Sequence, residues 1–291
     1  MRRDEPIKYL FIWPAVLVVL AIAIFPLVYS LAISFQTIRL VPPSPPRFVG
    51  LQNYATLLSQ PRFWETFWNT TVLVVFSVAL QYAIGFALAL ALFHKVPGER
   101  LFRVAFLLPM LMAPVAVALI WRMLFHSQLG PIADLFALFG LTGLPFLTDP
   151  IWAKASLIVV EVWQWTPFVV LLMLAGLQSL PDDIYEAARL EDASAWTQFW
   201  TITFPMLLPL SVAVVFIRII EAYKIIDTVF VLTGGGPGTS TETLTLYAYQ
   251  EGLKKFNLGY TSALSFAFLI LVLIIGTVYL AVLRPSVEKR V

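Results

Sequence analysis

Long apolar runs divide this sequence and constrain its fold more than any other feature. A helix needs about 20 predominantly apolar residues to cross the roughly 30 Å hydrocarbon core of a bilayer. The stretches long enough for this are residues 10–35, 67–93, 104–125, 156–177, 204–225 and 262–283. Their apolar residues are continuous and do not alternate, so they predict helices and not the strands of a barrel. We therefore expect an all-α membrane protein with six transmembrane helices.

The composition agrees with this class and excludes several functions. The 291 residues are 60% hydrophobic and 12% charged, with a mean hydropathy of +0.86, whereas soluble domains average about 25% charged residues. The net charge of +2 is too small to indicate nucleic-acid binding. There is no cysteine, and the two histidines, His94 and His126, lack metal-ligand spacing. Without a Walker, His-Glu-x-x-His or Gly-x-Ser-x-Gly motif, the chain is predicted not to be an enzyme.

The apolar runs also set the expected organisation of the chain. Residues 1–66 form an N-terminal tail, a first span and an outer loop; residues 67–283 form a five-helix core with a cytoplasmic loop at 178–203; residues 284–291 form a tail. The first run follows basic residues but is too long for a signal peptide, so we expect a retained span. The third run contains Pro109 and Pro114 and is expected to be kinked.

The distribution of lysine and arginine predicts the orientation. Cytoplasmic segments of membrane proteins carry an excess of these residues. With the N-terminus inside, the short cytoplasmic segments have the higher density of lysine and arginine. Both termini and the loop at 178–203 are therefore predicted to be cytoplasmic, in the multi-pass topology of a plasma-membrane protein.

Ionisable residues inside the apolar runs mark a candidate site. Glu161 lies in the fourth run, and Arg218 and Glu221 lie in the fifth. Charged groups in hydrocarbon are costly and normally face protein or water. Counting 1.5 Å per residue from the outer ends places all three in one layer in the outer half of the membrane, with Arg122 close to that level.

Helical spacing gives this layer a possible ligand. Glu161, Gln164 and Trp165 share one face of the fourth helix. A carboxylate, an amide and an indole on one face suit a sugar, because polar groups bind hydroxyls and a ring covers the apolar face of a pyranose. Two structural alternatives, in which the layer binds no ligand, remain open. In one, the tryptophans are anchors at the membrane interface. In the other, Arg218 forms a structural ion pair, either with Glu161 or with Glu221 three residues away.

The most polar segment of the chain runs from residue 181 to residue 205. Pro181 suits the start of a helix, and Ile184, Ala187, Ala188 and Glu191 share a face centred on two methyl groups. Ser194 suits the cap of a second helix, in which three aromatic residues share a face, namely Trp196, Phe199 and Trp200. These features predict a bent helical pair that offers a compact surface to another protein.

This segment resembles the EAA loop of inner-membrane permease subunits of ABC importers. The resemblance rests on Glu186, Ala187, Ala188, Asp192 and Ala193, followed by Ile202 and Pro205. It implies a type I permease fold whose loop docks on a separate ATPase, which binds ATP and Mg²⁺; no cofactor is implied on this chain. It also implies a second homologous permease, two ATPase subunits and an extracytoplasmic binding protein. The family usually has glycine where this chain has Asp192, a residue that tolerates left-handed geometry.

A glycine-rich stretch follows the fifth run on the predicted outer side. Its core is Gly234, Gly235, Gly236, Pro237 and Gly238. It lacks the lysine of a nucleotide-binding loop, and taken alone it is typical of a flexible hairpin. Together with residues 257–260, however, it resembles the carbohydrate-importing branch of these permeases, where such a loop lies near the translocation path.

These observations predict the permease subunit of an ATP-driven sugar importer of the prokaryotic inner membrane. It forms half of the pathway, works by alternating access and carries a di- or oligosaccharide such as maltose or trehalose. A glycerol-3-phosphate-type permease is an alternative, since Arg122 and Arg218 suit a phosphate. The rivals from other classes are an ion-coupled carrier that uses Glu161, an intramembrane enzyme and a membrane scaffold. Substrate identity and a homo- or heterodimeric pore stay open.

Overall fold

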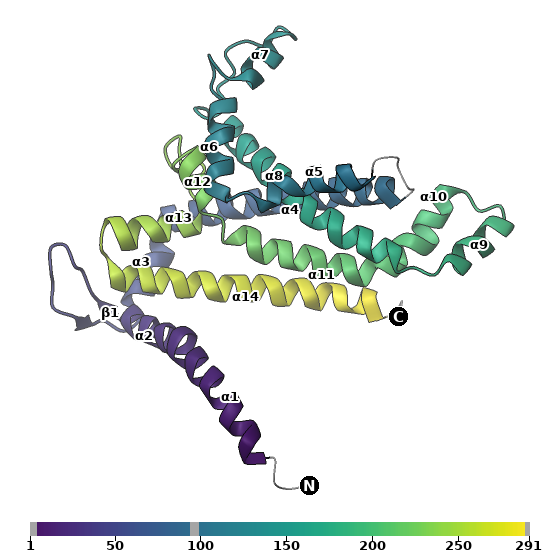
Figure 1. The fold of residues 1–291 in the computed structure, drawn as a ribbon. Helices are drawn as coiled ribbons and strands as arrows, with labels where there is room; N and C mark the ends of the chain where they lie inside the picture. The colour runs from purple at the N-terminus through teal and green to yellow at the C-terminus, as the bar shows by residue number, and fades with distance from the viewer. Residues whose placement is uncertain (1–4, 94–98, 289–291) are drawn as a thin grey trace. The chain divides into compact units, whose positions relative to one another are not determined.

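Helices account for nearly all of the regular structure (Figure 1). The computed structural model describes residues 5–93 and 99–288, so His94 and the outermost parts of both predicted tails lie outside the described residues. The elements are α1 Glu5–Val19, η1 Leu20–Ile24, α2 Phe25–Ser34, β1 Gln36–Thr37, β2 Arg47–Phe48, α3 Gln52–Ser59, α4 Pro61–Phe93, α5 Glu99–Leu111, α6 Pro114–Leu124, α7 Pro131–Ala137, α8 Pro150–Gln178, α9 Asp182–Leu190, α10 Ala195–Gln198, η2 Phe199–Thr203, α11 Phe204–Tyr223, α12 Asp227–Leu232, α13 Leu244–Tyr249, η3 Gln250–Lys254 and α14 Leu258–Glu288.

Five helical segments of the described chain are long and apolar enough to cross a membrane. They are Phe11–Ser34, Pro61–Phe93, Pro150–Gln178, Ala195–Tyr223 and Leu258–Leu283. Each overlaps one of the predicted runs, and each exceeds the length of about 20 residues that a bilayer requires. The all-α membrane class is confirmed.

The third predicted run is broken and not merely kinked. Helix α5 ends at Leu111, and α6, an apolar helix of 11 residues, begins at Pro114. Between them Ala113 is extended, with φ −62° and ψ 133°, a conformation favoured by the proline that follows it, because helical geometry is disfavoured for a residue before proline. Neither α5 nor α6 is long enough to span a bilayer alone, so the count of six crossings stays a prediction.

The chain divides into two compact units. The first unit is Met1–Phe63 with Tyr247–Leu271, and the second is Trp64–Leu246 with Val272–Val291. In the first unit β1 and β2 form an antiparallel hairpin with Gln36 opposite Phe48. The N–H of Leu258, at the start of α14, donates to the carbonyl of Ile38 at 2.9 Å. A Cβ on Gly259 would lie 2.0 Å from the carbonyl oxygen of Gln36, so only glycine allows the hairpin to lie this close to α14.

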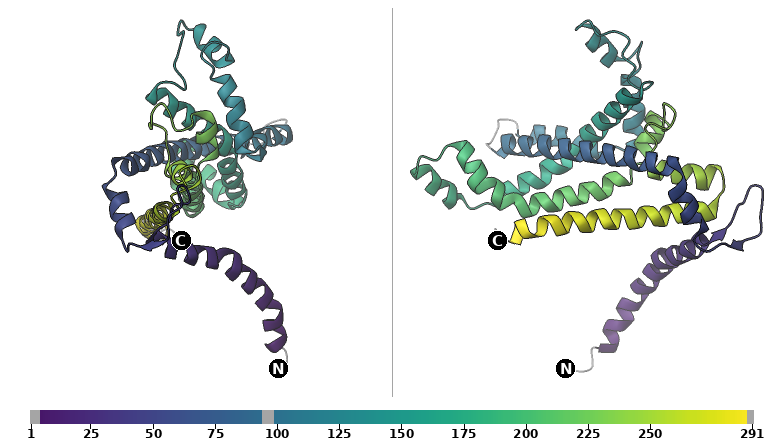
Figure 2. Two further views of the ribbon diagram at one scale, coloured as in Figure 1. Left: turned by 90° about the vertical axis from the view of Figure 1, so that its left-hand side faces the viewer. Right: turned by 180° about the vertical axis from the view of Figure 1, so that it is seen from behind.

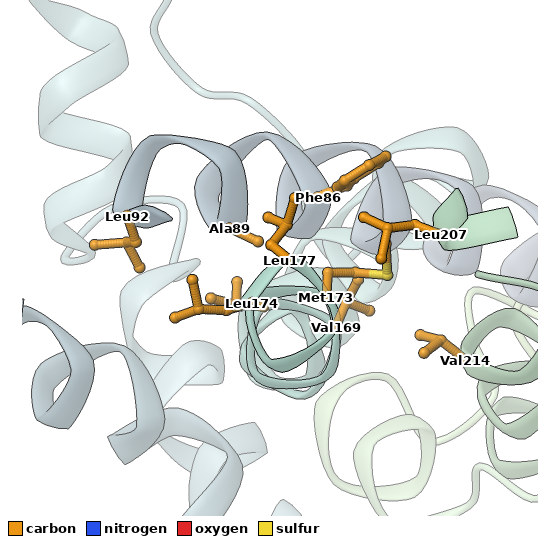
Figure 3. Packing of buried hydrophobic residues seen from close by; sticks show 10 residues of the cluster. Phe86, Ala89, Leu92, Val169, Met173, Leu174, Leu177, Leu207 and Val214 are labelled. Carbon is orange, nitrogen blue, oxygen red and sulfur yellow. The ribbon is translucent and has the colours of Figure 1, made fainter. Parts of the chain in front are cut away.

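The core of the second unit lies between α4, α8 and α11. Figure 3 shows Phe86 and Ala89 of α4 against Met173 and Leu177 of α8, with Leu207 of α11 beside them. Small residues let the backbones approach, as is usual between membrane helices; a Cβ on Gly85 would lie 2.7 Å from that of Val169. In Figure 1 and Figure 2, α9 and α10 lie at one end of α8 and α11, whereas α12 lies at the other.

Candidate functional site

Three polar side chains from three helices form a closed ring inside the second unit. Arg218 of α11 donates from Nη2 to Oε1 of Glu161 on α8, and from Nε to Oε1 of Gln81 on α4, both at 2.9 Å. Gln81 donates in turn from Nε2 to the backbone carbonyl of Glu161 at 3.0 Å. Glu161 and Arg218 are each only 2% exposed. We call Gln81, Glu161 and Arg218 the polar ring.

The polar ring explains how charge is tolerated at this depth. A charge in a water-free interior is stable only when it is paired and its remaining hydrogen-bonding positions are filled. Arg218 meets this condition through Glu161 and Gln81, and its guanidinium carbon also lies 4.7 Å from the centroid of the Trp165 ring. This distance allows a cation–π interaction. Of the two predicted pairings of Arg218, the structure therefore forms the one with Glu161.

A polar cavity of about 270 Å³ opens beside the ring. Four residues predicted to form the substrate path line it, namely Glu161, Trp165, Arg218 and Glu221. Lys224 and Asp227 add charge to the lining. Glu221 pairs with Lys224 at 2.7 Å, and both side chains are about half exposed, in contrast to the buried ring. The cavity thus has a buried charged wall and a second, more exposed ion pair.

Gln164 and Arg122 lie elsewhere than the sequence suggested. Gln164 is 1% exposed and donates to the carbonyl of Met112 at 3.3 Å, next to the break between α5 and α6. Its Oε1 is buried and has no hydrogen-bond partner within the described ranges. Arg122 donates to the carbonyl of Val231 at 3.0 Å and thereby ties α6 to α12. Neither residue lines the polar cavity.

A second candidate region is the segment from α9 to η2, residues 182–203, which we call the coupling elbow (Figure 1). Asp192 has φ +52°, the left-handed conformation expected for a residue in the usual glycine position. The N–H of Ala193 donates to the carbonyl of Ala188, and that of Asp192 to the carbonyl of Arg189. These two bonds form a Schellman motif, which satisfies the last carbonyls of α9. Ser194 then caps α10 by accepting from the N–H of Thr197 at 3.2 Å, as predicted.

The surface of the coupling elbow differs in part from the prediction. Glu186 and Ala187 are exposed, but Ala188 is buried at 9% exposure, so the two methyl groups do not share one open surface. Helix α9 ends at Leu190, and Glu191 is its C-terminal cap, with an N–H that donates to the carbonyl of Ala187 at 3.3 Å. Two large apolar side chains of the elbow are strongly exposed, Leu190 at 87% and Trp196 at 71%. These side chains are accessible to a partner protein or to the membrane surface.

The glycine-rich loop is anchored to α4 by hydrogen bonds and is not a free hairpin. Asn69 donates to the carbonyl of Thr239 at 2.9 Å, and Thr239 donates to Glu65 at 2.7 Å. Positive φ angles occur at Gly234, Gly235 and Gly238. At Gly235 a Cβ would also lie 3.2 Å from Leu246. The loop therefore needs glycine at three positions for its backbone conformation, and at Gly235 also to make room for the side chain of Leu246.

Sequence reasoning missed two residues of the cavity region. Gln81 closes the polar ring, and Lys224 pairs with Glu221 in the lining. The available signal for Gln81 was an amide in the middle of an apolar run, where polar groups are costly unless they are bonded. Lys224 sits three residues after Glu221, which is the spacing of a helical ion pair.

Comparison with known proteins identifies this architecture. Residues 81–290 match the binding-protein-dependent transport system inner membrane component family. The chain belongs to this family. The matched region begins at Gln81 and contains the polar ring, the coupling elbow and the glycine-rich loop. The chain is therefore a permease subunit of a transport system and not an enzyme.

Two curated relatives and one solved structure resemble this permease along nearly its full length. The trehalose/maltose transport system permease protein MalF of Thermococcus litoralis is 34% identical over 284 residues, which are 97% of this chain and 95% of that protein. The sulfoquinovosyl glycerol transport system permease protein SmoG of Agrobacterium fabrum is 32% identical, over 97% and 92% of the two chains. A bacterial ABC transporter that imports the acidic polysaccharide alginate has the same fold, with a TM-score of 0.85, 21% identity and coverage of 98% and 96%.

Proposed function

We propose that this permease is the membrane subunit of an ATP-driven importer of a di- or oligosaccharide, and that the polar cavity is this chain's part of the sugar path. The observation that carries the proposal is the lining of the cavity. Glu161, Arg218 and Glu221 supply hydrogen-bonding groups, and Trp165 supplies an aromatic ring. Small-molecule sites combine apolar and aromatic walls with a few polar groups in this way.

The size of the cavity supports a path shared between two subunits. Small-molecule pockets enclose about 300–1,000 Å³, whereas this cavity has about 270 Å³. The cavity thus lies just below the usual range for a site on a single chain. A second, homologous permease that faces the cavity supplies the missing wall, and each subunit then forms half of the path.

The chemistry of the cavity favours a sugar over glycerol 3-phosphate. Of the two arginines that suit a phosphate, Arg218 is already paired with Glu161, and Arg122 lies outside the cavity on the carbonyl of Val231. The lining of the cavity has three carboxylates, Glu161, Glu221 and Asp227, against two cations, Arg218 and Lys224, so its net charge is negative. A negative lining repels a phosphate. The names of the relatives, which are transport permeases for trehalose, maltose and a sulfoquinovosyl glycerol, support the carbohydrate class.

Energy for transport enters through the coupling elbow in this proposal. Two separate ATPase subunits bind ATP and Mg²⁺ and hold Glu186, Ala187 and the turn at Asp192. Both chain termini and the elbow then lie in the cytoplasm of a prokaryote, and the cavity opens toward an extracytoplasmic binding protein. One alginate-transporter structure was solved with a pentasaccharide-bound periplasmic protein, which supports a partner of this kind. Movement of the elbow exposes the cavity to one side at a time.

A pair of neighbouring tryptophans tests the sugar path. Trp165 lines the polar cavity, whereas Trp163 packs edge-on against Trp121 and lines a separate apolar groove. We expect Trp165→Ala to raise the KM for ATP-driven uptake of maltose or trehalose about fivefold in proteoliposomes that contain the whole importer, since losing one stacking contact costs on the order of 1 kcal/mol. Trp163→Ala should leave KM unchanged.

Two outcomes would contradict the proposal. Equal KM changes in the two tryptophan variants would remove the cavity from the sugar path. Uptake that persists with an ATPase-dead partner and collapses with the ion gradient would instead favour the ion-coupled carrier. Glycerol 3-phosphate, supplied as the competing substrate, should not inhibit uptake.

A further inference from the structure

A second polar cleft, of about 540 Å³, lies in the first unit. It is formed by the hairpin strand β1 and its flank, by α3, and by the residues around the start of α14. Its charged lining consists of Arg39, Arg62 and Lys255 with a single carboxylate, Glu251. Three cations therefore face one anion, and the cleft has a positive charge before anything binds.

The charged groups of the cleft are held in place by one another. Glu251 is 8% exposed and accepts from Arg62 at 3.5 Å and from Lys255 at 2.5 Å. Arg62 also donates to Gln250 at 2.7 Å, and its guanidinium carbon lies 4.5 Å from the centroid of the Tyr247 ring. Arg39 is exposed at the edge of the cleft. A site with cations fixed beforehand binds an anion without first ordering long side chains.

Two tyrosine hydroxyls form the floor of the cleft. The hydroxyls of Tyr247 and Tyr260 lie 2.8 Å from each other and 2.8 Å from Oε1 of Gln60. Tyr247 and Tyr260 are buried at 1% and 6% exposure. Both hydroxyl protons are used within this cluster, so the floor is a fixed, buried wall. The donors that an oxyanion meets in the cleft are the N–H groups of its cationic side chains.

The surroundings of the cleft place it at the membrane surface. The first span ends at Ser34, two residues before β1, and the last span begins at Leu258, next to the lining residue Asn257. Large apolar side chains in the segments that form the cleft are exposed: Leu40, Val41, Phe48, Leu253 and Phe256. Cations combined with exposed apolar side chains at the end of a span are typical of a segment that lies in the headgroup layer.

We propose that this cleft binds the phosphate of an anionic phospholipid headgroup. The cationic side chains hold the phosphate oxygens, and the exposed apolar side chains of the hairpin and of residues 253–256 lie against the acyl chains. The proposal does not rest on the sugar path, because the cleft and the polar cavity belong to different units of the chain.

Native mass spectrometry of the whole importer tests the proposal, with phosphatidylglycerol and phosphatidylcholine as probes. We expect phosphatidylglycerol to be retained preferentially. Since each lysine or arginine near an anionic membrane surface contributes roughly fivefold in affinity, Arg39→Gln and Lys255→Gln should each reduce its retention about fivefold, and the double variant about 25-fold. Arg47→Gln is the matched control, because Arg47 is exposed on β2 of the same hairpin and does not line the cleft.

The remaining outcomes overturn the proposal. Equal retention of the two lipids, or an equal loss in the Arg47→Gln variant, would show that the cleft is not the lipid site. Competition by millimolar inorganic phosphate or glycerol 3-phosphate that removes the lipid completely would assign the cleft to a soluble anion. Unchanged lipid retention combined with weaker docking of the binding protein would assign it to a protein partner.

Discussion

The coupling elbow and the polar ring carry charge in opposite ways, although both belong to the second unit. Glu186 of the elbow is exposed at the end of α8 and α11 where α9 and α10 lie (Figure 1). Glu161 and Arg218 of the ring are 2% exposed between helices. Most hydrogen bonds that shape the elbow join residues at most five positions apart, such as Ala193 to Ala188, and one longer bond joins the hydroxyls of Tyr185 and Thr203 at 2.9 Å. The ring joins residues 57 and 137 positions apart in the chain.

This difference separates two kinds of dependence on charge. An exposed charge is solvated whether or not a partner is present, so its value lies in what it recognises. A buried charge depends on its partner for solvation, so removing either one leaves a group that the interior cannot tolerate. Substitutions in the elbow should therefore affect transport more than stability, and substitutions in the ring should affect stability first.

The largest effect is expected when the polar ring loses one charge. Arg218→Leu leaves the Glu161 carboxylate buried without its partner, and we expect the free energy of unfolding to fall by about 3–5 kcal/mol. Denaturant unfolding of the purified protein in detergent measures this. Glu161→Gln leaves the buried guanidinium of Arg218 without its counter-charge, and the free energy of unfolding should fall by a similar amount.

The double variant Glu161→Gln with Arg218→Leu sharpens this result. Because the two residues form one pair, the loss in the double variant should be smaller than the sum of the single losses, by a coupling energy on the order of 1–3 kcal/mol. If the two losses in the free energy of unfolding simply add, Glu161 and Arg218 do not stabilise each other as a pair, and the contrast with the elbow disappears.

A smaller effect, of a different kind, is expected from a charge reversal in the elbow. Glu186→Lys should reduce ATP-driven uptake and co-purification of the ATPase about tenfold or more, because a like-charge contact at an interface costs several kcal/mol. The unfolding midpoint should not change, since Glu186 is exposed. Asp134→Lys, the same reversal on the exposed helix α7, is the control for uptake. Unchanged uptake in the Glu186 variant would remove the coupling role.

The smallest effect is expected at the turn of the elbow. Asp192→Val places a β-branched residue at φ +52° and should destabilise the turn by about 1–2 kcal/mol, whereas Asp192→Gly should stabilise it slightly. Hydrogen exchange at the N–H of Ala193, which bonds to Ala188, reports this directly. Asp183→Val, within the first turn of α9, is the control and should leave that exchange rate unchanged. An unaltered exchange rate at the N–H of Ala193 in the Asp192→Val variant would show that a β-branched residue does not strain the backbone at this position.

The elbow was more predictable than the ring because most of its hydrogen bonds join residues that are close in the chain. Ser194 as a cap and Asp192 as a turn residue follow from their chemistry and from the spacing of their neighbours, and both are confirmed. The burial of Ala188 was not predictable, since it depends on how α9 packs. In the ring, Gln81 was missed because nothing in the apolar run around it indicates which helices will face it.

The break in the third apolar run lies between these two cases. Pro109 and Pro114 predicted a distortion, and the extended conformation of Ala113 is favoured by the proline that follows it. That the run forms two helices, and that Gln164 donates to the exposed carbonyl of Met112, depends on the packing of α8 against α5 and α6.

The sequence alone determined that this protein is a helical membrane protein with a polar elbow, because hydrophobic length and local hydrogen bonding depend only on neighbouring residues. The tertiary structure decided which intramembrane charges are partners and which residues share a cavity. Glu161 pairs with Arg218, and Glu221 pairs with Lys224. The pairing of Glu161 with Arg218 is set by the packing of distant helices, and the desolvation of buried charge makes that packing decisive. The pair of Glu221 and Lys224 is local, since the two residues are three positions apart.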